Sequence, residues 1–454
     1  MTTTRPVGDV EGLLRRQIAH CLKGAFYRQR SEELGVDLTK VRTLEDLREL
    51  PVFVTPDLHR KAQEESLRTE GHPFGTFLCV RPDEVVAVSS TSGTTGEPTF
   101  YPFTRRDVEI TDTLWIRALR FIGVRPGDVV LQGFGLSMYL AGIPLVRALE
   151  RMGATPVPVG AEAGTEKLLR MARLVKPRVL ACTPSYASYL LEKVPEVLGV
   201  QARDLGVEII MCAGEPGAGL PEVREKLEEG WGASVHDVLG GAHGIIMASG
   251  PGEYVGMHVL SDDYSVTTDL VDPATKEPID VVDGAIGERV KTSLEWGAAP
   301  PLRYSVGDIY QVFTEPLPGL PPGPRVKVLG RVDDLLIVKG VKLYPAAVQD
   351  VISSFVPDTT GELRIVLDGP PPRVTPPLRL KVEHGPGVAA DDLEGLRRRL
   401  VQAMHDRLTV RPEVELVPPG SLPRSTHKTR LIEVTPSETA HPTPSRDVPG
   451  KEPA

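Results

Sequence analysis

Between Asp128 and Cys212 the sequence alternates between short apolar runs and longer amphipathic runs. The short runs are typical of buried strands: Asp128–Leu131, Ala154–Pro158, Arg178–Thr183 and Val207–Cys212. Alternation at these lengths favours βαβ crossovers and a largely parallel sheet. Such sheets bind ligands at the carboxyl ends of their strands, so we expect the loops after these runs to carry the function.

A loop of small hydroxylated residues follows an earlier apolar run. Val85–Val88 is typical of a buried strand, and Ser89–Thr99 then reads Ser-Ser-Thr-Ser-Gly-Thr-Thr-Gly-Glu-Pro-Thr. The backbone N–H groups and hydroxyls of such a loop can surround an anion such as phosphate. The spacing of the lysine-containing P-loop is absent. We predict a phosphate-binding loop, with a flexible turn as the alternative.

The composition indicates a globular protein with more than one domain. A chain of 454 residues predicts two or three domains, and 41% hydrophobic with 25% charged residues fits a soluble protein. The net charge of −9 argues against a general nucleic-acid or acidic-membrane partner. No apolar run approaches about 18 residues, and the cysteines show no CxxC spacing. We expect a cytoplasmic protein.

The remaining segments have hydrophobic patterns that predict other kinds of structure. Residues 9–35 have apolar side chains at near-helical spacing, which predicts one amphipathic helix. From Met257 the alternation suits antiparallel strands or a small barrel. The predicted fold class is α/β. Layered α/β sheets and an antiparallel barrel-like part form a large domain over 1–329, followed by a small mobile α+β domain over 330–434 and a disordered tail over 435–454.

Several motifs match one superfamily in the same order. Thr91–Thr99 resembles the phosphate loop of the adenylate-forming enzymes, which include acyl-CoA synthetases, adenylation domains and luciferases. Later motifs are similar to the phenylacetate–CoA ligase branch: Thr183–Ala187, Ala213–Pro216, Gly256–His258 and Gly330–Val341. The resemblance extends from about Leu13 to Val434, and the shared order of the motifs carries it.

The resemblance implies an ATP-dependent acid–CoA ligase. Such enzymes activate a carboxylic acid with ATP, release pyrophosphate with Mg²⁺ and form an acyl-adenylate, from which the CoA thiolate displaces AMP. The implied cofactors are ATP, Mg²⁺ and CoA, and the implied partner is a small carboxylic acid. The small C-terminal domain of these enzymes rotates between the two half-reactions.

The resemblance also assigns nucleotide-binding roles. Phosphate would meet Thr91, Ser92, Gly93, Thr94, Thr95 and Gly96. Adenine and ribose would meet Gly214, Glu215, Pro216, Asp237, Leu239, Asp308 and Arg331. A carboxylate such as Asp308 suits two ribose hydroxyls, and the planar guanidinium of Arg331 suits ribose or phosphate.

The other implied roles concern catalysis and the acyl group. Lys428 would bridge the carboxylate and the α-phosphate, where negative charge concentrates. Asp333 would be the hinge, and Lys339 with Gly340 would line the CoA channel. The candidates for an acyl pocket are Phe134, Ser137, Met138, Tyr139, Tyr186 and Gly240. An aromatic lining favours an aryl or arylacetyl acid, and core packing is the alternative for each aromatic.

One segment departs from the family pattern. Leu239, Ala242 and His243 stand where the family has a tyrosine, a hydroxyl residue and the glutamate that binds Mg²⁺. Histidine suits that ion poorly, because Mg²⁺ prefers oxygen ligands. His243 is predicted to meet phosphate as a cation or to act as a general base, with a loop histidine of no role as the alternative. The metal ligands stay unassigned.

Three other functions remain as alternatives. Activation could end in transfer to a carrier protein or an amine in secondary metabolism. An acyltransferase on this scaffold would use a ready-made thioester without ATP, with His243 as its base. A non-catalytic nucleotide-binding protein is the third. The presence of Asp308, Arg331 and Lys428 argues against the last two. The acid used and a homodimeric assembly stay open.

Overall fold

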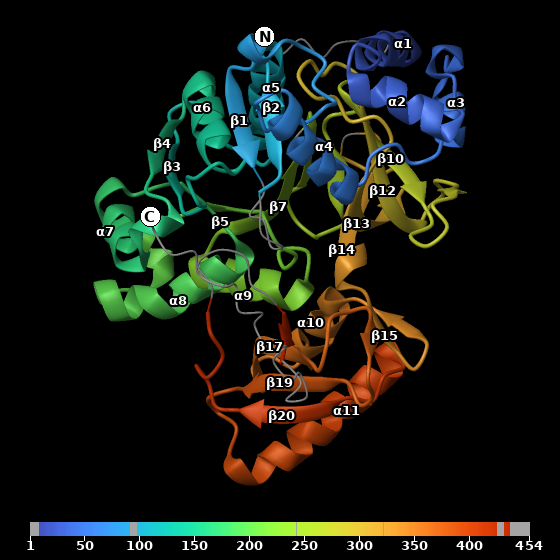
Figure 1. Ribbon diagram of the computed structural model, residues 1–454. Coiled ribbons are helices and arrows are strands. Elements are labelled where there is room, and N and C mark those ends of the chain that lie inside the picture. Colours follow the sequence, from blue (N-terminus) through green and yellow to red (C-terminus); the bar gives the residue numbers. More distant parts are fainter. Residues whose placement is uncertain (1–8, 91–97, 242, 321, 425–430, 436–454) are drawn as a thin grey trace, which may run out of the picture. The chain divides into compact units, whose positions relative to one another are not determined.

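The computed structural model describes residues 9–90, 98–241, 243–320, 322–424 and 431–435. It divides into two compact units (Figure 1). Of the described residues, the first unit holds 9–333 with Pro423 and Arg424, and the second holds 334–422 and 431–435. Both units mix helices and sheets, which confirms the α/β class. The predicted disordered tail lies outside the described residues, except Thr435.

A parallel sheet forms one half of the first unit. Its strands pair in the order β7-β6-β5-β3-β4, all parallel, which confirms the predicted alternation. They are β3 (Val129–Gln132), β4 (Thr155–Pro158), β5 (Val179–Cys182), β6 (Ile209–Cys212) and β7 (Ser234–Gly241). The connecting helices are α6 (Ile143–Met152), α7 (Thr165–Val175), α8 (Pro184–Leu198) and α9 (Pro221–Trp231).

Both faces of this sheet are buried. Val130 and Met211 belong to one apolar cluster, whereas Leu131 and Ile210 belong to another. Neighbouring residues of a strand point to opposite faces, so each continuous apolar run supplies both clusters. This burial explains why these strands read as apolar runs rather than as alternating sequences.

Antiparallel strands continue the same sheet, because β8 pairs antiparallel with β7. The order continues as β8-β9-β14-β13-β12-β10-β11. These strands are β8 (Ile245–Ser249), β9 (Met257–Val259), β10 (Ser265–Val271), β11 (Pro278–Ile279), β12 (Ile286–Ser293), β13 (Tyr304–Phe313) and β14 (Arg325–Arg331). A separate hairpin of β1 (Ala87–Ser90) and β2 (Phe100–Phe103) flanks the predicted phosphate loop, whose residues 91–97 lie outside the described ranges.

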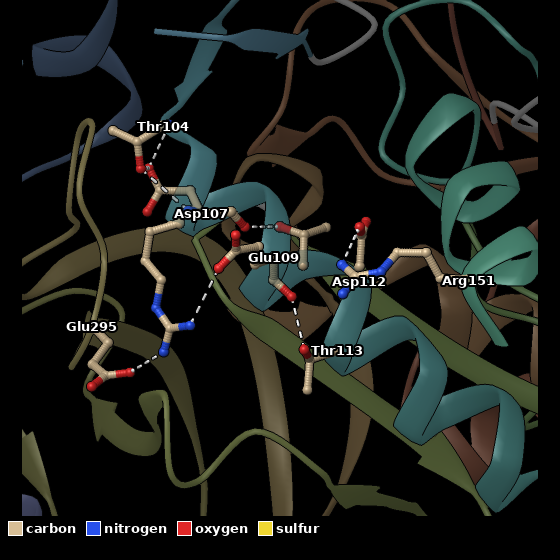
Figure 2. Close-up of polar contacts among 9 residues, drawn as sticks. Thr104, Asp107, Glu109, Asp112, Thr113, Arg151 and Glu295 are labelled. Atoms are coloured by element: carbon tan, nitrogen blue, oxygen red, sulfur yellow. Dashed lines mark hydrogen bonds and ion pairs between the residues drawn. The ribbon is translucent and has the colours of Figure 1, made fainter. Parts of the chain in front are cut away.

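Helix α5 (Arg105–Phe121) is fixed to its neighbours by buried carboxylates (Figure 2). The Thr104 side chain caps the helix, and Asp107 accepts hydrogen bonds from the backbone N–H groups of Gly297 and Ala298 at 2.7 and 2.9 Å. Asp112 accepts from the guanidinium groups of α6, including Arg151 at 2.7 Å. These bonds fix the loop that carries Trp296.

The N-terminal segment forms four helices: α1 (Val10–Cys21), α2 (Ala25–Leu34), α3 (Leu44–Glu49) and α4 (Pro56–Thr69). The prediction of one helix over 9–35 was wrong, because the chain turns between α1 and α2. Gly24 caps α2 with an extended backbone, and a Cβ there would lie 3.1 Å from the Cys79 sulfur. Periodicity persists through such a turn, so the sequence pattern did not reveal it.

The second unit is a small α+β module with its own apolar core. One sheet has the order β20-β19-β17-β21 and a second has β16-β15-β18. The elements are β15 (Leu336–Val338), β16 (Val341–Leu343), α10 (Pro345–Ser353), β17 (Thr359–Leu367), β18 (Arg373–Val374), β19 (Arg379–His384), α11 (Leu393–Leu408), β20 (Glu413–Val417) and β21 (Ile432–Val434). Across both units, no described helix has the length and apolarity needed to span a membrane.

Candidate active site

Asp308 lies at the centre of an ion cluster on the antiparallel strands. Its two carboxylate oxygens accept from Arg289 on β12 and from Arg331 on β14, each at 2.9 Å. Register explains the second bond, since Asp308 and Arg331 are cross-strand partners. We call Asp308, Arg289 and Arg331 the Asp308 cluster. Each carboxylate oxygen can accept more than one hydrogen bond, so the cluster retains capacity for ribose hydroxyls.

A second group of side chains gathers around His243. Its members come from β2, α4, β12 and β13 and from the loops after β7 and β12. We call it the His243 chamber, and it comprises His59, Tyr101, His243, Lys291, Trp296 and Tyr304. The His243 ring meets the rings of Tyr101 and Trp296 with centroids 5.1 and 5.8 Å apart. The Lys291 ammonium lies 5.1 Å from the centroid of the Tyr304 ring, within the range of a cation–π contact.

The backbone at His243 is strained. Its φ of +72° is uncommon for a residue with a Cβ. The His243 carbonyl accepts hydrogen bonds from the Ser265 and Ser293 hydroxyls at 3.2 and 2.8 Å. These two hydroxyls hold the turn in its strained form. Strain that neighbours enforce is typical of functional positions.

Both histidines of the chamber are neutral at pH 7. Burial lowers the pKa of His243 well below its usual value, and the nearby Lys291 lowers it further. Burial lowers the pKa of His59 to about 3. His59 Nε2 is 3.2 Å from the Phe100 carbonyl, which can only accept, so Nδ1 accepts from the Tyr304 hydroxyl. A neutral His243 does not fit the predicted cation, and its role stays a prediction.

Besides Arg331, this region holds two positive groups that the sequence did not single out, Arg289 and Lys291. Both are nearly fully buried, at 4% and 5% exposed. Burial lowers the pKa of Lys291 to about 7, and Arg289 acts in the same direction, against Asp308. The sequence feature that could have revealed these residues is a pair of cations at alternate positions of a strand that is otherwise buried.

The predicted adenine side lies on the loop after β6 and on strand β7 itself. Gly214 has a φ of +91°, and the Glu215 carboxylate accepts from the Ser185 backbone N–H at 2.9 Å. Asp237 accepts from the Tyr254 hydroxyl at 3.1 Å, and burial raises its pKa to about 6. Leu239 packs on the edge of an apolar cluster of the antiparallel strands. Pro216 is exposed. The adenine and ribose roles stay predictions.

The six acyl-pocket candidates occupy different environments. Phe134 is buried in the cluster on one face of the parallel sheet, and Gly240 lies against Trp115 in the same cluster. Tyr186 is fully buried in the cluster on the other face, with its hydroxyl 3.2 Å from the Thr165 hydroxyl. Ser137 and Met138 are exposed, and Tyr139 is half-buried. The alternative of core packing therefore suits Tyr186 best.

The remaining predicted residues lie elsewhere. Thr91, Ser92, Gly93, Thr94, Thr95, Gly96, Ala242 and Lys428 are outside the described residues. Asp333 is the last residue of the first unit before the chain enters the second. Lys339 and Gly340 form the exposed two-residue turn between β15 and β16, both with positive φ. That geometry is a type I′ turn, in which a lysine is strained.

The described residues form no dedicated magnesium site. No group of three or more His, Cys, Asp or Glu side chains among them is arranged to hold a metal. His243 offers nitrogen where Mg²⁺ prefers oxygen, and both oxygens of Asp308 already meet guanidinium groups. No step is therefore assigned to magnesium held by these side chains.

Comparison with known proteins identifies the class. Residues 340–433 match the AMP-binding enzyme C-terminal domain family. A crystal structure of 2-hydroxyisobutyryl-CoA ligase in complex with 2-HIB-AMP has a TM-score of 0.84 and 28% identity, covering 94% of this chain and 89% of that one. An anthranilate CoA ligase structure at 20% identity and a TM-score of 0.55 shares the fold. The fold is that of acyl-CoA ligases.

Curated relatives narrow the class further. The phenylacetate–coenzyme A ligase of Thermus thermophilus is 32% identical over 440 residues, which is 91% of this chain and 93% of the relative. The enzyme of the same name from Escherichia coli is 29% identical over 78% of each chain. The chain belongs to the phenylacetate–CoA ligase family of adenylate-forming enzymes. It is an acid–thiol ligase that uses ATP and CoA.

Proposed function

We propose that this ligase activates an aromatic acid, such as an arylacetate, to an acyl-adenylate and transfers the acyl group to CoA. The observation that carries the proposal is the Asp308 cluster, which presents a fixed carboxylate beside Arg331 as the resemblance implies for ribose recognition. The aromatic acid is supported by relatives named for phenylacetate. The 2-hydroxyisobutyryl-CoA ligase shows that a similar fold also takes an aliphatic acid.

The proposed chemistry uses the chain's own residues in two half-reactions. In the first, the acid carboxylate attacks the α-phosphate of ATP and pyrophosphate leaves, with the Lys428 ammonium offsetting the charge of the two anions. Asp308 and Arg331 hold the ribose, while the 214–216 loop and Leu239 cover adenine. In the second, the CoA thiolate attacks the acyl carbonyl and AMP leaves. Lys339 and Gly340 line the CoA path, and Asp333 serves as the hinge.

Mg²⁺ enters this proposal only as the ion that accompanies ATP. The phosphate oxygens of the nucleotide are hard ligands that bind it without a protein cage. A carrier-protein pantetheine remains the alternative acceptor, because it presents the same thiol arm as CoA.

The test is ATP–pyrophosphate exchange with a panel of phenylacetate, benzoate and 2-hydroxyisobutyrate, followed by chromatography of the thioester formed with CoA. We expect exchange with an aromatic acid and formation of its CoA ester. Absence of exchange with every acid would refute the ligase. Exchange with 2-hydroxyisobutyrate alone would refute the aromatic assignment, and exchange without a CoA ester would favour a carrier acceptor.

Lys428→Ala separates the two half-reactions. It should abolish exchange while sparing thiolysis of a supplied acyl-adenylate by CoA. The matched control is Lys40→Ala, whose side chain is 82% exposed and distant in sequence from the predicted site residues. Equal loss of both half-reactions in Lys428→Ala, with Lys40→Ala unchanged, would contradict the assigned role.

A further inference from the structure

Strand β12 carries two buried cations on one face. Arg289 and Lys291 are two residues apart, so their side chains project to the same side of the sheet. Such cations are rarely buried to this degree unless a charged group accompanies them. Glu288 lies on the opposite face, where it contacts Ser305 and Lys276 and does not pair with Arg289 or Lys291. The face of β12 that carries Arg289 and Lys291 is therefore basic.

Asp308 is a carboxylate that several cations of this region share. Asp308 attracts Lys291, while Arg289 repels it. The same carboxylate is shared between Arg289 and Arg331. His243 and His59 are neutral, and Tyr101 and Tyr304 contribute rings. Arg289 and Lys291 are both buried, and Asp308 is shared between Arg289 and the partly exposed Arg331, so an approaching anion would be favoured beside them.

Buried donors both on this face of β12 and in the His243 chamber lack acceptors among the described residues. They are Nε and Nη1 of Arg289 and Nε1 of Trp296, and Nδ1 of His243 is likewise without a partner. Buried polar groups are normally hydrogen-bonded, so several such atoms in one region point to a ligand. A ligand with many acceptor oxygens would satisfy more of them than a single carboxylate.

The chamber also lies beside the β1–β2 hairpin. Tyr101, whose ring packs on His243, is the cross-strand partner of Ser89. The Ser90 N–H, at the end of β1, donates to the Met138 carbonyl at 2.8 Å. The β1–β2 hairpin therefore packs against the His243 chamber through Tyr101.

We propose that Arg289 and Lys291 bind the polyphosphate oxygens of ATP directly, as further substrate-binding residues of this ligase. The proposal rests on the proposed function, because it takes ATP as the substrate. The carboxylate of the acid is the other anion in the reaction, and the experiment separates the two.

The experiment measures binding of inorganic pyrophosphate and of phenylacetate to the full chain by calorimetry, with a chelator present. The variants are Lys291→Met, which keeps length and removes charge, Lys291→Arg, which keeps charge, and the exposed control Lys40→Met. We expect wild type and Lys40→Met to bind pyrophosphate without Mg²⁺. Lys291→Met should bind it roughly tenfold or more weakly, and Lys291→Arg within roughly threefold of wild type.

Two outcomes would overturn the proposal: wild type that binds no pyrophosphate without Mg²⁺, or a folded Lys291→Met that binds it unchanged. Weakened phenylacetate binding with unchanged pyrophosphate binding would assign the face to the acid instead, and would also overturn it. If Lys291→Met shows no melting transition, Lys291→Gln is judged by the same criteria. ATP–pyrophosphate exchange with Mg²⁺ on the same wild-type sample tests the proposed function separately, since loss of exchange does not depend on binding in chelator.

Discussion

The Asp308 cluster and the His243 chamber share strand β12 but treat buried charge in opposite ways. In the cluster, a carboxylate lies between two guanidinium groups, and its oxygens are hydrogen-bonded. In the chamber, an ammonium faces aromatic rings and neutral histidines, and the turn at His243 is strained. In the cluster the opposite charges of Asp308 and its two guanidinium partners offset one another, whereas the chamber holds a buried lysine and a strained turn that cost stability. Such features mark the sites where a ligand is expected.

Removal of the carboxylate should have the largest effect. Asp308→Ala leaves Arg289 buried without its partner, so we expect the free energy of unfolding to fall by about 3–5 kcal/mol. Urea titration of the apoprotein measures this loss. A loss below about 1 kcal/mol would show that the cluster does not depend on its carboxylate, and would weaken the contrast with the chamber.

Removal of the ammonium should act in the opposite direction. Lys291→Met should raise the free energy of unfolding at pH 7 by about 2–4 kcal/mol, because the folded-state pKa of Lys291 is about 7 instead of 10.5. Between pH 7 and pH 10.5 the lysine of the unfolded state is protonated and that of the folded state is not. The stability gained by Lys291→Met is therefore complete below pH 7 and disappears as the pH rises toward 10.5.

The measurement is urea unfolding of wild type and Lys291→Met at pH 7 and pH 10. The other titratable groups of the region, which both proteins share, are Arg289, Asp308, His243 and His59. Lys40→Met, with its exposed side chain, is the control and should show no pH-dependent difference. A destabilised Lys291→Met at both pH values would mean that packing of the lysine stem outweighs its charge.

The neutral histidines predict a pH effect of intermediate size. The folded-state pKa of His59 is about 3, below its usual 6.5, so its contribution to stability is present above pH 6.5 and is lost as the pH falls. His59→Gln can retain both hydrogen bonds without titrating. Between pH 7 and pH 4, the free energy of unfolding of His59→Gln should rise by about 2 kcal/mol relative to that of wild type.

Thermal unfolding of both proteins across this range tests the prediction. Asp237, whose folded-state pKa is raised to about 6, acts in the opposite direction but is common to both proteins and cancels in the difference. Parallel curves for wild type and His59→Gln would contradict a neutral, buried His59.

The smallest effect is expected at Asp333, which also contacts Arg331. This pair is separated by 3.4 Å, and the Asp333 side chain is 75% exposed. Exposed pairs contribute little, so Asp333→Ala should change the free energy of unfolding by less than about 0.5 kcal/mol. Asp308→Ala and Asp333→Ala thus form a matched comparison on one guanidinium. A loss from Asp333→Ala as large as that from Asp308→Ala would remove the distinction between buried and exposed partners.

The sequence alone predicted the architecture from local patterns. Continuous apolar runs predicted the parallel strands, because both faces of that sheet are buried. The order of the motifs predicted the family, because the chemistry of a site requires particular residue types at particular places along the chain. The sequence also showed that position 243 lacks the expected glutamate. It did not reveal the break between α1 and α2, since a turn at Gly24 leaves the periodicity intact.

Only the tertiary structure decided how charge is arranged around the site. Arg289 and Lys291 read as two ordinary cations of a strand, and nothing local indicates that Asp308 is shared or that Trp296 and Tyr101 enclose His243. These contacts join residues that are not neighbours in the sequence, through strand register and loop anchoring. Burial then sets their protonation, because the energy of a charge depends on what surrounds it rather than on its neighbours in sequence.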